Sequence, residues 1–159
     1  MYDFDEIERR EREQWVATEP SWALWEVMRT STSVGHALAQ RLGLSYNEVR
    51  ALELLSDSVR GLGTVELAHG LGMRSASATE LVDRLEASGH VGRRLHETDR
   101  RRVVVELTPE GRDKVLAVLG PLLERYDRVA AGLSPEAADA VAAYLRAVAA
   151  EQRAFCAED

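Results

Sequence analysis

The stretch of sequence that decides the fold is Asp99-Arg100-Arg101-Arg102-Val103-Val104-Val105-Glu106-Leu107-Thr108. Three consecutive arginines stand before an apolar run, which ends at the turn sequence Pro109-Glu110-Gly111. A second apolar and basic run, residues 90–96, precedes the arginines. Two short strands joined by a cationic tip are typical of a β-wing, so we predict a hairpin from Val91 to Leu107. Alternation along the second strand places Val103 and Val105 on one face and Val104 and Glu106 on the other. Val105 and Leu107 are expected to point to the core, with Val104 on the outer face.

A helix-turn-helix pattern lies directly upstream of this hairpin. Ser45 and Glu48 form a capping box, which predicts a helix from about residue 46. Thr64 is expected to cap a short helix over residues 65–71, and Ser75 to cap a helix over residues 76–88 that ends at Gly89. The positions predicted to face the core are Val49, Leu52, Leu55, Leu81, Val82 and Leu85.

Further helices flank this segment on both sides. We expect a short charged helix over residues 3–17 and a long helix from a Ser21 cap to about Leu42. Another is expected beyond Pro109, and a last one after Ser134-Pro135-Glu136. The predicted fold class is mainly α with a small β-wing. Residues 44–111 would be a winged helix-turn-helix DNA-binding domain, and residues 1–43 and 112–159 a helical dimerisation region.

Composition and charge bound the function. The chain has 159 residues and a net charge of −7, but residues 74–114 carry nine cations against eight anions. Within this segment, residues 90–102 hold five arginines against Glu97 and Asp99, so the positive charge is concentrated near the hairpin tip. There is no glycine-rich phosphate loop, metal triad or nucleophile elbow, so we do not expect an enzyme or a cofactor.

The remaining composition points to a reducing compartment. Cys156 is the only cysteine, which excludes an intramolecular disulfide and suits the cytoplasm. The sequence has no apolar run long enough for a membrane span, so no membrane partner is expected. His36, His69, His90 and His96 have no metal-ligand spacing with Cys156, and no metal site is predicted.

Several motifs carry a resemblance to a known family. They are Thr64-Val65-Glu66-Leu67-Ala68, Leu81-Val82-Asp83-Arg84-Leu85-Glu86, Asp99-x-Arg101 and Val105-x-Leu107-Thr108. In this order and spacing the sequence resembles the MarR family of multiple antibiotic resistance regulators, over roughly residues 44–112. The resemblance implies a homodimer of winged helices, usually a repressor, that is joined through its terminal helices. It also implies release of DNA when a small aromatic or anionic effector binds.

The helix after Ser75 is the expected recognition helix, with its N-terminal face in the major groove of double-stranded DNA. Its predicted DNA contacts are Arg74, Ser75, Ser77, Thr79 and Arg84. Short hydroxyl side chains suit phosphate contacts and adaptable base contacts. Glu80 departs from the family, where many members carry arginine. We expect this carboxylate simply to weaken phosphate affinity, the alternative being that it accepts a hydrogen bond from cytosine N4.

The wing residues are expected to bind DNA in two ways. Arg101 matches the family's wing-tip arginine, which enters the minor groove, where the narrow walls concentrate negative potential. Asp99 matches the acid that shapes the tip. Arg100 and Arg102 are predicted phosphate contacts.

Trp22, Trp25, His36 and Tyr46 are the candidate ligand-pocket residues. Two interpretations are open: a cavity for an effector, or plain core and dimer interface. At the level of the whole chain, we predict a dimeric, ligand-responsive regulator that binds a pseudo-palindromic operator. The alternative is a winged-helix module for protein partners, and salt-dependent binding of duplex DNA separates the two.

Overall fold

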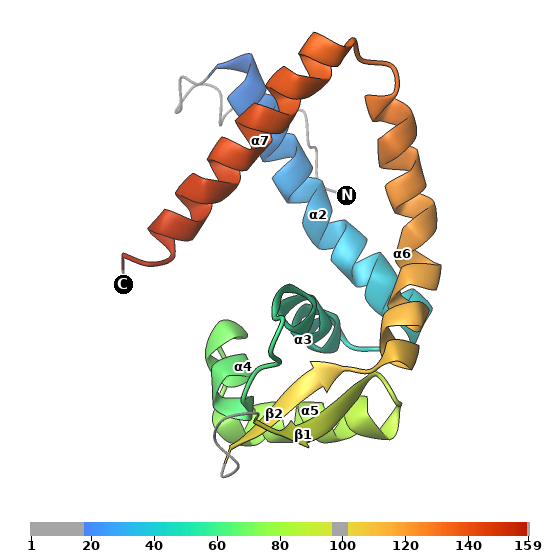
Figure 1. The fold of residues 1–159 in the computed structure, drawn as a ribbon, viewed down its shortest axis with the longest axis vertical. Coiled ribbons are helices and arrows are strands. Elements are labelled where there is room, and N and C mark those ends of the chain that lie inside the picture. Colours follow the sequence, from blue (N-terminus) through green and yellow to red (C-terminus); the bar gives the residue numbers. More distant parts are fainter. Residues whose placement is uncertain (1–17, 97–101, 159) are drawn as a thin grey trace, which may run out of the picture. The chain divides into compact units, whose positions relative to one another are not determined.

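The structure, a computed structural model, describes residues 18–96 and 102–158. The chain divides into two compact units, Met1–Val115 and Leu116–Asp159. The described elements, in chain order (Figure 1), are α2 (Glu19–Leu42), α3 (Tyr46–Asp57), α4 (Thr64–Gly70), α5 (Ser75–Ala87), β1 (Val91–Leu95), β2 (Val103–Leu107), α6 (Pro109–Ala130) and α7 (Pro135–Phe155). This confirms a mainly helical fold with one small β-wing. The helix expected over residues 3–17 lies outside the described residues.

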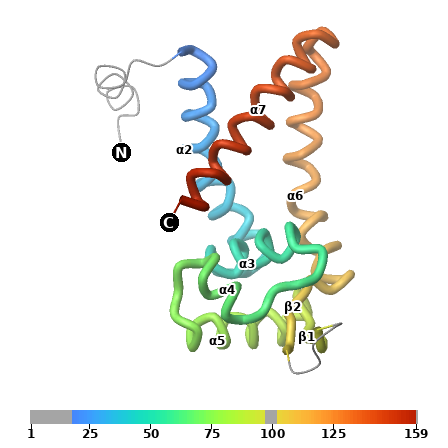
Figure 2. The backbone as a smooth tube through the Cα atoms, turned by 60° about the vertical axis from the view of Figure 1, so that its left-hand side comes forward, coloured from blue at the N-terminus to red at the C-terminus, as the bar shows by residue number. Residues whose placement is uncertain are grey.

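The core of the first unit is built by α3, α4, α5 and the hairpin, which lie together in Figure 2. Each helix contributes one apolar stripe, and burial of these stripes is what holds the short elements together. The buried cluster is Ala51, Leu52, Leu55, Leu67, Leu81, Val82, Leu85, Val91 and Val105. Val49 is buried as well, so the predicted inward positions of α3 and α5 are confirmed.

The hairpin is antiparallel, with Val91 opposite Leu107 and Leu95 opposite Val103. One expectation was wrong: Val104 is buried, with 2% of its surface exposed, although alternation placed it on the outer face. The reason is a third segment. Leu62 forms an isolated bridge with Val105, and Gly61, with φ of +73°, packs beside Val104. A side chain at Gly61 would lie 2.6 Å from the Val105 carbonyl oxygen, so only glycine fits.

Three helices start earlier than predicted. α2 is capped by Thr18 rather than Ser21, because Pro20 fits the first turn, where its missing N–H has no intrahelical partner to lose. The N-caps of α4 and α5 are Gly63 and Arg74, so Thr64 and Ser75 are the first helical residues. The capping box is confirmed: Ser45 Oγ accepts from Glu48 N at 3.3 Å, and Ser45 N donates to Glu48 Oε2 at 2.8 Å.

The second unit contains the end of α6 and all of α7. Ser134 caps α7 as predicted, accepting a hydrogen bond from Ala137 N at 3.2 Å. No residue of α7, which is described in full, is buried. No described helix is long and apolar enough to cross a membrane.

Candidate nucleic-acid interface

Helix α5 has one buried and one open face. Ala78, Leu81, Val82 and Leu85 face the core, each with at most 1% of its surface exposed. The predicted contacts Ser75, Ser77 and Thr79 are all exposed. Thr79 Oγ1 donates to Ser75 O at 3.0 Å, which uses its proton but leaves lone pairs for a donor from DNA. The first two turns of α5 therefore expose short polar side chains, and the major groove of DNA is wide enough to admit an α-helix.

Arg74 lies at the N-cap of α5 and is exposed. Within residues 18–96 and 102–158, no carboxylate forms an ion pair with it. Its guanidinium is free to bind a phosphate beside the helix N-terminus, which itself favours anions. Of the predicted arginine contacts that the structure describes, this is the one without an ion pair.

Arg84 is held by the capping residue of another helix. Its Nε lies 2.8 Å from Glu48 Oε1, while 58% of its side-chain surface stays exposed. Burial raises the pKa of Glu48, but hydrogen bonds from the Ser45 backbone, Arg84 and the Ser45 hydroxyl outweigh it and lower that pKa. Glu48 therefore stays ionised and anchors Arg84 between α3 and α5.

Arg102, at the base of the wing, has a similar partner. Its Nη2 lies 3.0 Å from Glu66 Oε1, and both side chains are about half exposed. A hydrogen bond from the Gly63 backbone lowers the pKa of Glu66, with a further contribution from Arg102. Sequence reasoning missed both glutamates as arginine partners, although the capping pattern already singled out Glu48.

Two more arginines tie the hairpin to its surroundings. Arg93 of β1 pairs with Asp83 at 2.5 Å and also donates to Glu86, both on α5. The hydrogen bond with Asp83 raises the pKa of Arg93. Arg94 donates to Glu106 on the neighbouring strand and to Arg60 O at 3.0 Å. Arg93 thus ties the hairpin to α5, whereas Arg94 joins the two strands to the segment at Arg60, and the charges of both arginines are largely compensated.

The wing tip is outside the described residues. Asp99, Arg100 and Arg101 all fall there. Their predicted roles in shaping the tip and binding DNA therefore stay predictions.

Comparison with known proteins places this geometry in a family. The family model described as MarR family matches residues 44–103. The chain is 33% identical over 102 residues to the uncharacterized HTH-type transcriptional regulator YcgE of Bacillus subtilis (strain 168), covering 64% of this chain and 66% of the relative. The winged helix-turn-helix segment of the chain, residues 44–103, belongs to the MarR family.

Two further relatives extend the comparison. The HTH-type transcriptional repressor YetL of the same Bacillus strain is 34% identical over 105 residues, covering 65% of this chain and 62% of YetL. A crystal structure of a MarR-family transcriptional regulator from Silicibacter pomeroyi matches with a TM-score of 0.60 and 26% identity, over 84% of this chain and 89% of that one. The chain spans just under two thirds of the length of the two Bacillus relatives.

The four candidate pocket residues fall into two groups. The rings of His36 and Tyr46 stack, with centroids 4.5 Å apart and planes at 25°. Trp22 is buried and Trp25 is 38% exposed. Trp25 and His36 are separated by about 16 Å along the axis of α2, given the rise per residue of an α-helix. The structure thus stacks His36 on Tyr46, and a cavity lined by all four rings stays a prediction.

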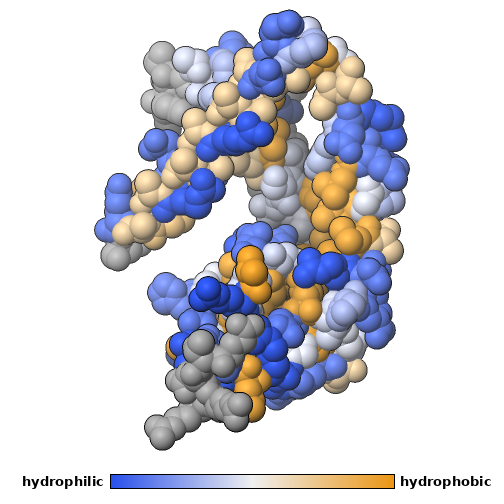
Figure 3. All heavy atoms as spheres, viewed as in Figure 1, coloured by the Kyte–Doolittle hydropathy of each residue, from blue (hydrophilic) through white to orange (hydrophobic). Residues whose placement is uncertain are grey.

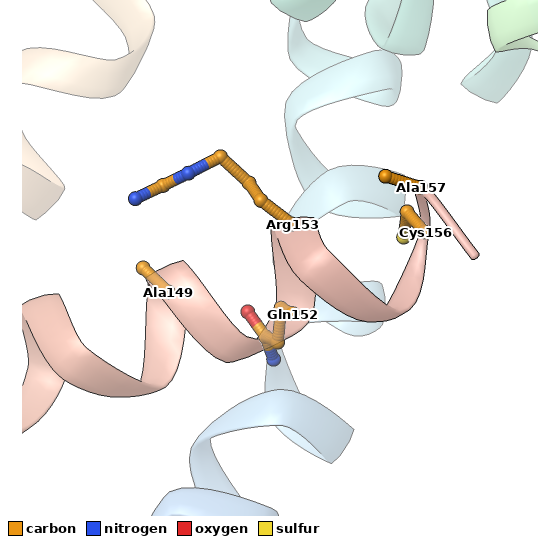
Figure 4. A pocket seen from close by; sticks show the side chains of 5 residues that line it. All are labelled: Ala149, Gln152, Arg153, Cys156 and Ala157. Atoms are coloured by element: carbon orange, nitrogen blue, oxygen red, sulfur yellow. The ribbon is translucent and has the colours of Figure 1, made fainter.

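A separate hollow lies on the last turns of α7 (Figure 4). It is lined by Ala149, Gln152, Arg153, Cys156 and Ala157. All five belong to one helical segment, so the hollow is shallow. Cys156 is exposed there. Among the described residues, no group of histidines, cysteines and carboxylates has the arrangement of a metal site.

A buried histidine marks the junction where β1 meets the start of α6. His90 is 5% exposed, and its Nδ1 lies 2.8 Å from Ser88 Oγ. Its Nε2 is buried without a hydrogen-bond partner in the described structure. Burial lowers the pKa of His90, and the Lys114 charge adds to this, against opposing effects of Glu110 and Glu48. The folded protein therefore favours the neutral imidazole.

This lowered pKa predicts a pH-dependent stability. The unfolded state binds the His90 proton more tightly, so the free energy of unfolding should fall as the pH drops below about 6.5 toward the lower pKa of the folded state. Urea unfolding on both sides of that pH measures the effect. His90→Asn, which keeps a hydrogen-bonding group near Ser88, should flatten this part of the profile. The exposed His69→Asn should not, and equal profiles for all three proteins would contradict the assignment.

Proposed function

We propose that this MarR-family protein is a dimeric DNA-binding transcriptional regulator, and specifically a repressor. The observation that carries the proposal is the exposed polar face of α5, from Arg74 to Thr79, on a helix whose opposite face is fully buried. A basic hairpin follows directly in the chain and is tied to α5 through Arg93. The relative YetL is named a transcriptional repressor, which supports repression rather than activation. No described site favours catalysis over this function.

In the proposed complex, α5 lies in the major groove and the wing in the adjacent minor groove. Arg74, Ser75, Ser77 and Thr79 contact DNA from the first turns of α5. Arg84, Arg100 and Arg102 bind phosphates, and Arg101 enters the minor groove. A dimer binds two half-sites about one helical turn apart, so the operator is a pseudo-palindrome.

Selection of bound sequences from a pool of random duplexes tests this proposal. We expect enrichment of a pseudo-palindrome with half-site centres about 10 base pairs apart. Recovery of unrelated sequences together with salt-independent retention would instead favour a module for protein partners. The same binding assay, repeated with aromatic carboxylates, tests effector release. Such compounds should weaken DNA binding and quench Trp22 or Trp25 if the effector site lies near the rings.

The second unit supports the dimer. Its large apolar side chains are exposed: Leu116, Leu123, Tyr126, Val129, Leu133, Val141, Leu145 and Phe155. Figure 3 shows hydrophobic atoms gathered on the visible face of α6. A unit of this size with no buried residue on α7 cannot supply its own core. A second copy of the chain would cover these side chains.

Leu145→Glu is therefore expected to weaken the dimer. Leu145 lies on the α7 stripe with Val141 and Val148, and a carboxylate there would be buried without a partner in the dimer. The dissociation constant of the dimer should rise by a factor that corresponds to about 2 kcal/mol or more. Analytical ultracentrifugation measures the change. Ala143→Glu adds the same charge at an exposed position off the stripe and should leave the dimer intact.

A further inference from the structure

Two glutamates of the winged helix share one arrangement. Each lies in the first turn of a helix, and each binds the backbone of its own N-cap residue with one carboxylate oxygen. The other oxygen binds an arginine that we assign to the DNA surface. The two pairs are Glu48 with Arg84 and Glu66 with Arg102.

At the first pair the carboxylate is almost completely enclosed. The Glu48 side chain is 8% exposed, and its Oε2 accepts from Ser45 N at 2.8 Å and from Ser45 Oγ at 2.9 Å. Its Oε1 accepts from Arg84 Nε at 2.8 Å. The described hydrogen bond of the Arg84 side chain uses Nε, so the two terminal nitrogens remain available for a phosphate.

At the second pair, which is more exposed, the two carboxylate oxygens again accept from different partners. Glu66 Oε2 accepts from Gly63 N at 2.6 Å, and Oε1 accepts from Arg102 Nη2 at 3.0 Å. The N-terminal ends of α3 and α4 partly compensate the two carboxylate charges. The arginines therefore keep attraction for phosphate while their positions are fixed.

We propose that Glu48 and Glu66 are positioning residues for DNA binding, which hold Arg84 and Arg102 in the conformations that contact phosphate. The inference rests on the proposed function of the chain. A free arginine loses much rotamer entropy when it binds, and an arginine held in advance loses less. If only net charge mattered, replacing either glutamate would strengthen DNA binding, because it removes a carboxylate that repels phosphate. The positioning role predicts weaker binding instead. The direction of the effect therefore tests the proposal.

The experiment measures the affinity of the full chain for a mixed-sequence duplex of about 30 base pairs at low salt, long enough for two half-sites. Glu48→Gln and Glu66→Gln should each weaken binding about threefold to tenfold, the order expected when an arginine regains part of its rotamer freedom. Glu53→Gln is the matched control. Glu53 lies on α3, pairs with Arg50 at 3.4 Å and carries the same charge, so its loss should not weaken binding.

Two variants separate positioning from helix stability. Ser45→Ala weakens the cap of α3 and removes one hydrogen bond to Glu48, but the bonds from Ser45 N and Arg84 Nε remain. It should therefore lower the melting temperature and reduce DNA affinity less than Glu48→Gln does. In an Arg84→Ala background, Glu48→Gln should have no further effect on binding, as a double-mutant cycle requires for residues that act together. Glu66→Gln should likewise have no further effect on DNA binding in an Arg102→Ala background.

The outcomes are distinguishable. If the unaltered protein does not bind the duplex, the proposed function fails. If it binds, but Glu48→Gln and Glu66→Gln bind as tightly as Glu53→Gln, the positioning role is wrong while the proposed function stands. The positioning role would also be wrong if Glu48→Gln still weakened binding in the Arg84→Ala background, or Glu66→Gln in the Arg102→Ala background. Should Glu48→Gln fail to fold, the exposed Glu66 still decides the question.

Discussion

Gly111→Ala should destabilise the first unit more than any other single methyl group added to the fold. A Cβ at Gly111 would lie 2.1 Å from the His90 carbonyl oxygen and 2.7 Å from its Cα and carbonyl carbon. These are backbone atoms, and they are held in place: His90 N donates to Leu85 O at 2.9 Å, and Thr108 N donates to His90 O at 3.1 Å. The start of α6 would have to move away from β1.

We expect the free energy of unfolding to fall by about 3 kcal/mol, at the upper end of overpacking effects. This lowers the melting temperature by roughly 6–12 °C for a chain of this size. Thermal and urea unfolding measure the change. Gly120→Ala is the control on the same helix, because no described atom lies within 4 Å of its added Cβ and alanine favours the helix. If both variants unfold like the parent protein, α6 does not lie against β1 as described.

Arg101→Ala should cause the largest loss of DNA affinity. The expectation comes from the sequence, since Arg101 matches the wing-tip arginine of the MarR family. Loss of one good groove contact weakens binding by about 1–3 kcal/mol per half-site, and a dimer loses it twice. Folding should be almost unchanged, because a wing tip contributes little to the core. Fluorescence anisotropy with a selected operator, alongside thermal unfolding, measures both effects.

Neighbouring arginines provide the contrast. Arg100→Ala and Arg102→Ala should weaken binding nearly equally on any sequence and lower the salt slope, as lost phosphate contacts do. Asp99→Ala should resemble a milder Arg101→Ala. If Arg101→Ala binds the operator as tightly as the parent protein at physiological salt, the wing does not read the minor groove.

The local elements of this fold were predictable because their signals are local. Ser45 and Glu48 are three residues apart and determine the start of α3. The apolar spacing of Leu81, Val82 and Leu85 determines which face of α5 is buried. Helix starts were displaced by one residue where Gly63 and Arg74, rather than the neighbouring hydroxyl residues, took the cap position.

The tertiary pairs were not predictable from such patterns. Arg84 and Glu48 are 36 positions apart, and no periodicity relates them. Burial of Val104 depends on the segment at Gly61 and Leu62, which bridges Val105 of the same strand, and alternation within one hairpin does not reveal this. The sequence therefore predicted which residues form the candidate DNA-binding surface. The glutamates that pair with its arginines could be identified only from the structure.

The central claim is that the chain binds duplex DNA through phosphate contacts around α5 and the wing. The most direct test is the dissociation constant for a selected duplex as a function of salt concentration. We predict that log Kd rises linearly with log salt, with a slope of about 0.9 for each phosphate neutralised, and that Arg74→Ala lowers that slope by about one per protomer. Absence of binding at low salt, or a dissociation constant that does not change with salt, would contradict the account.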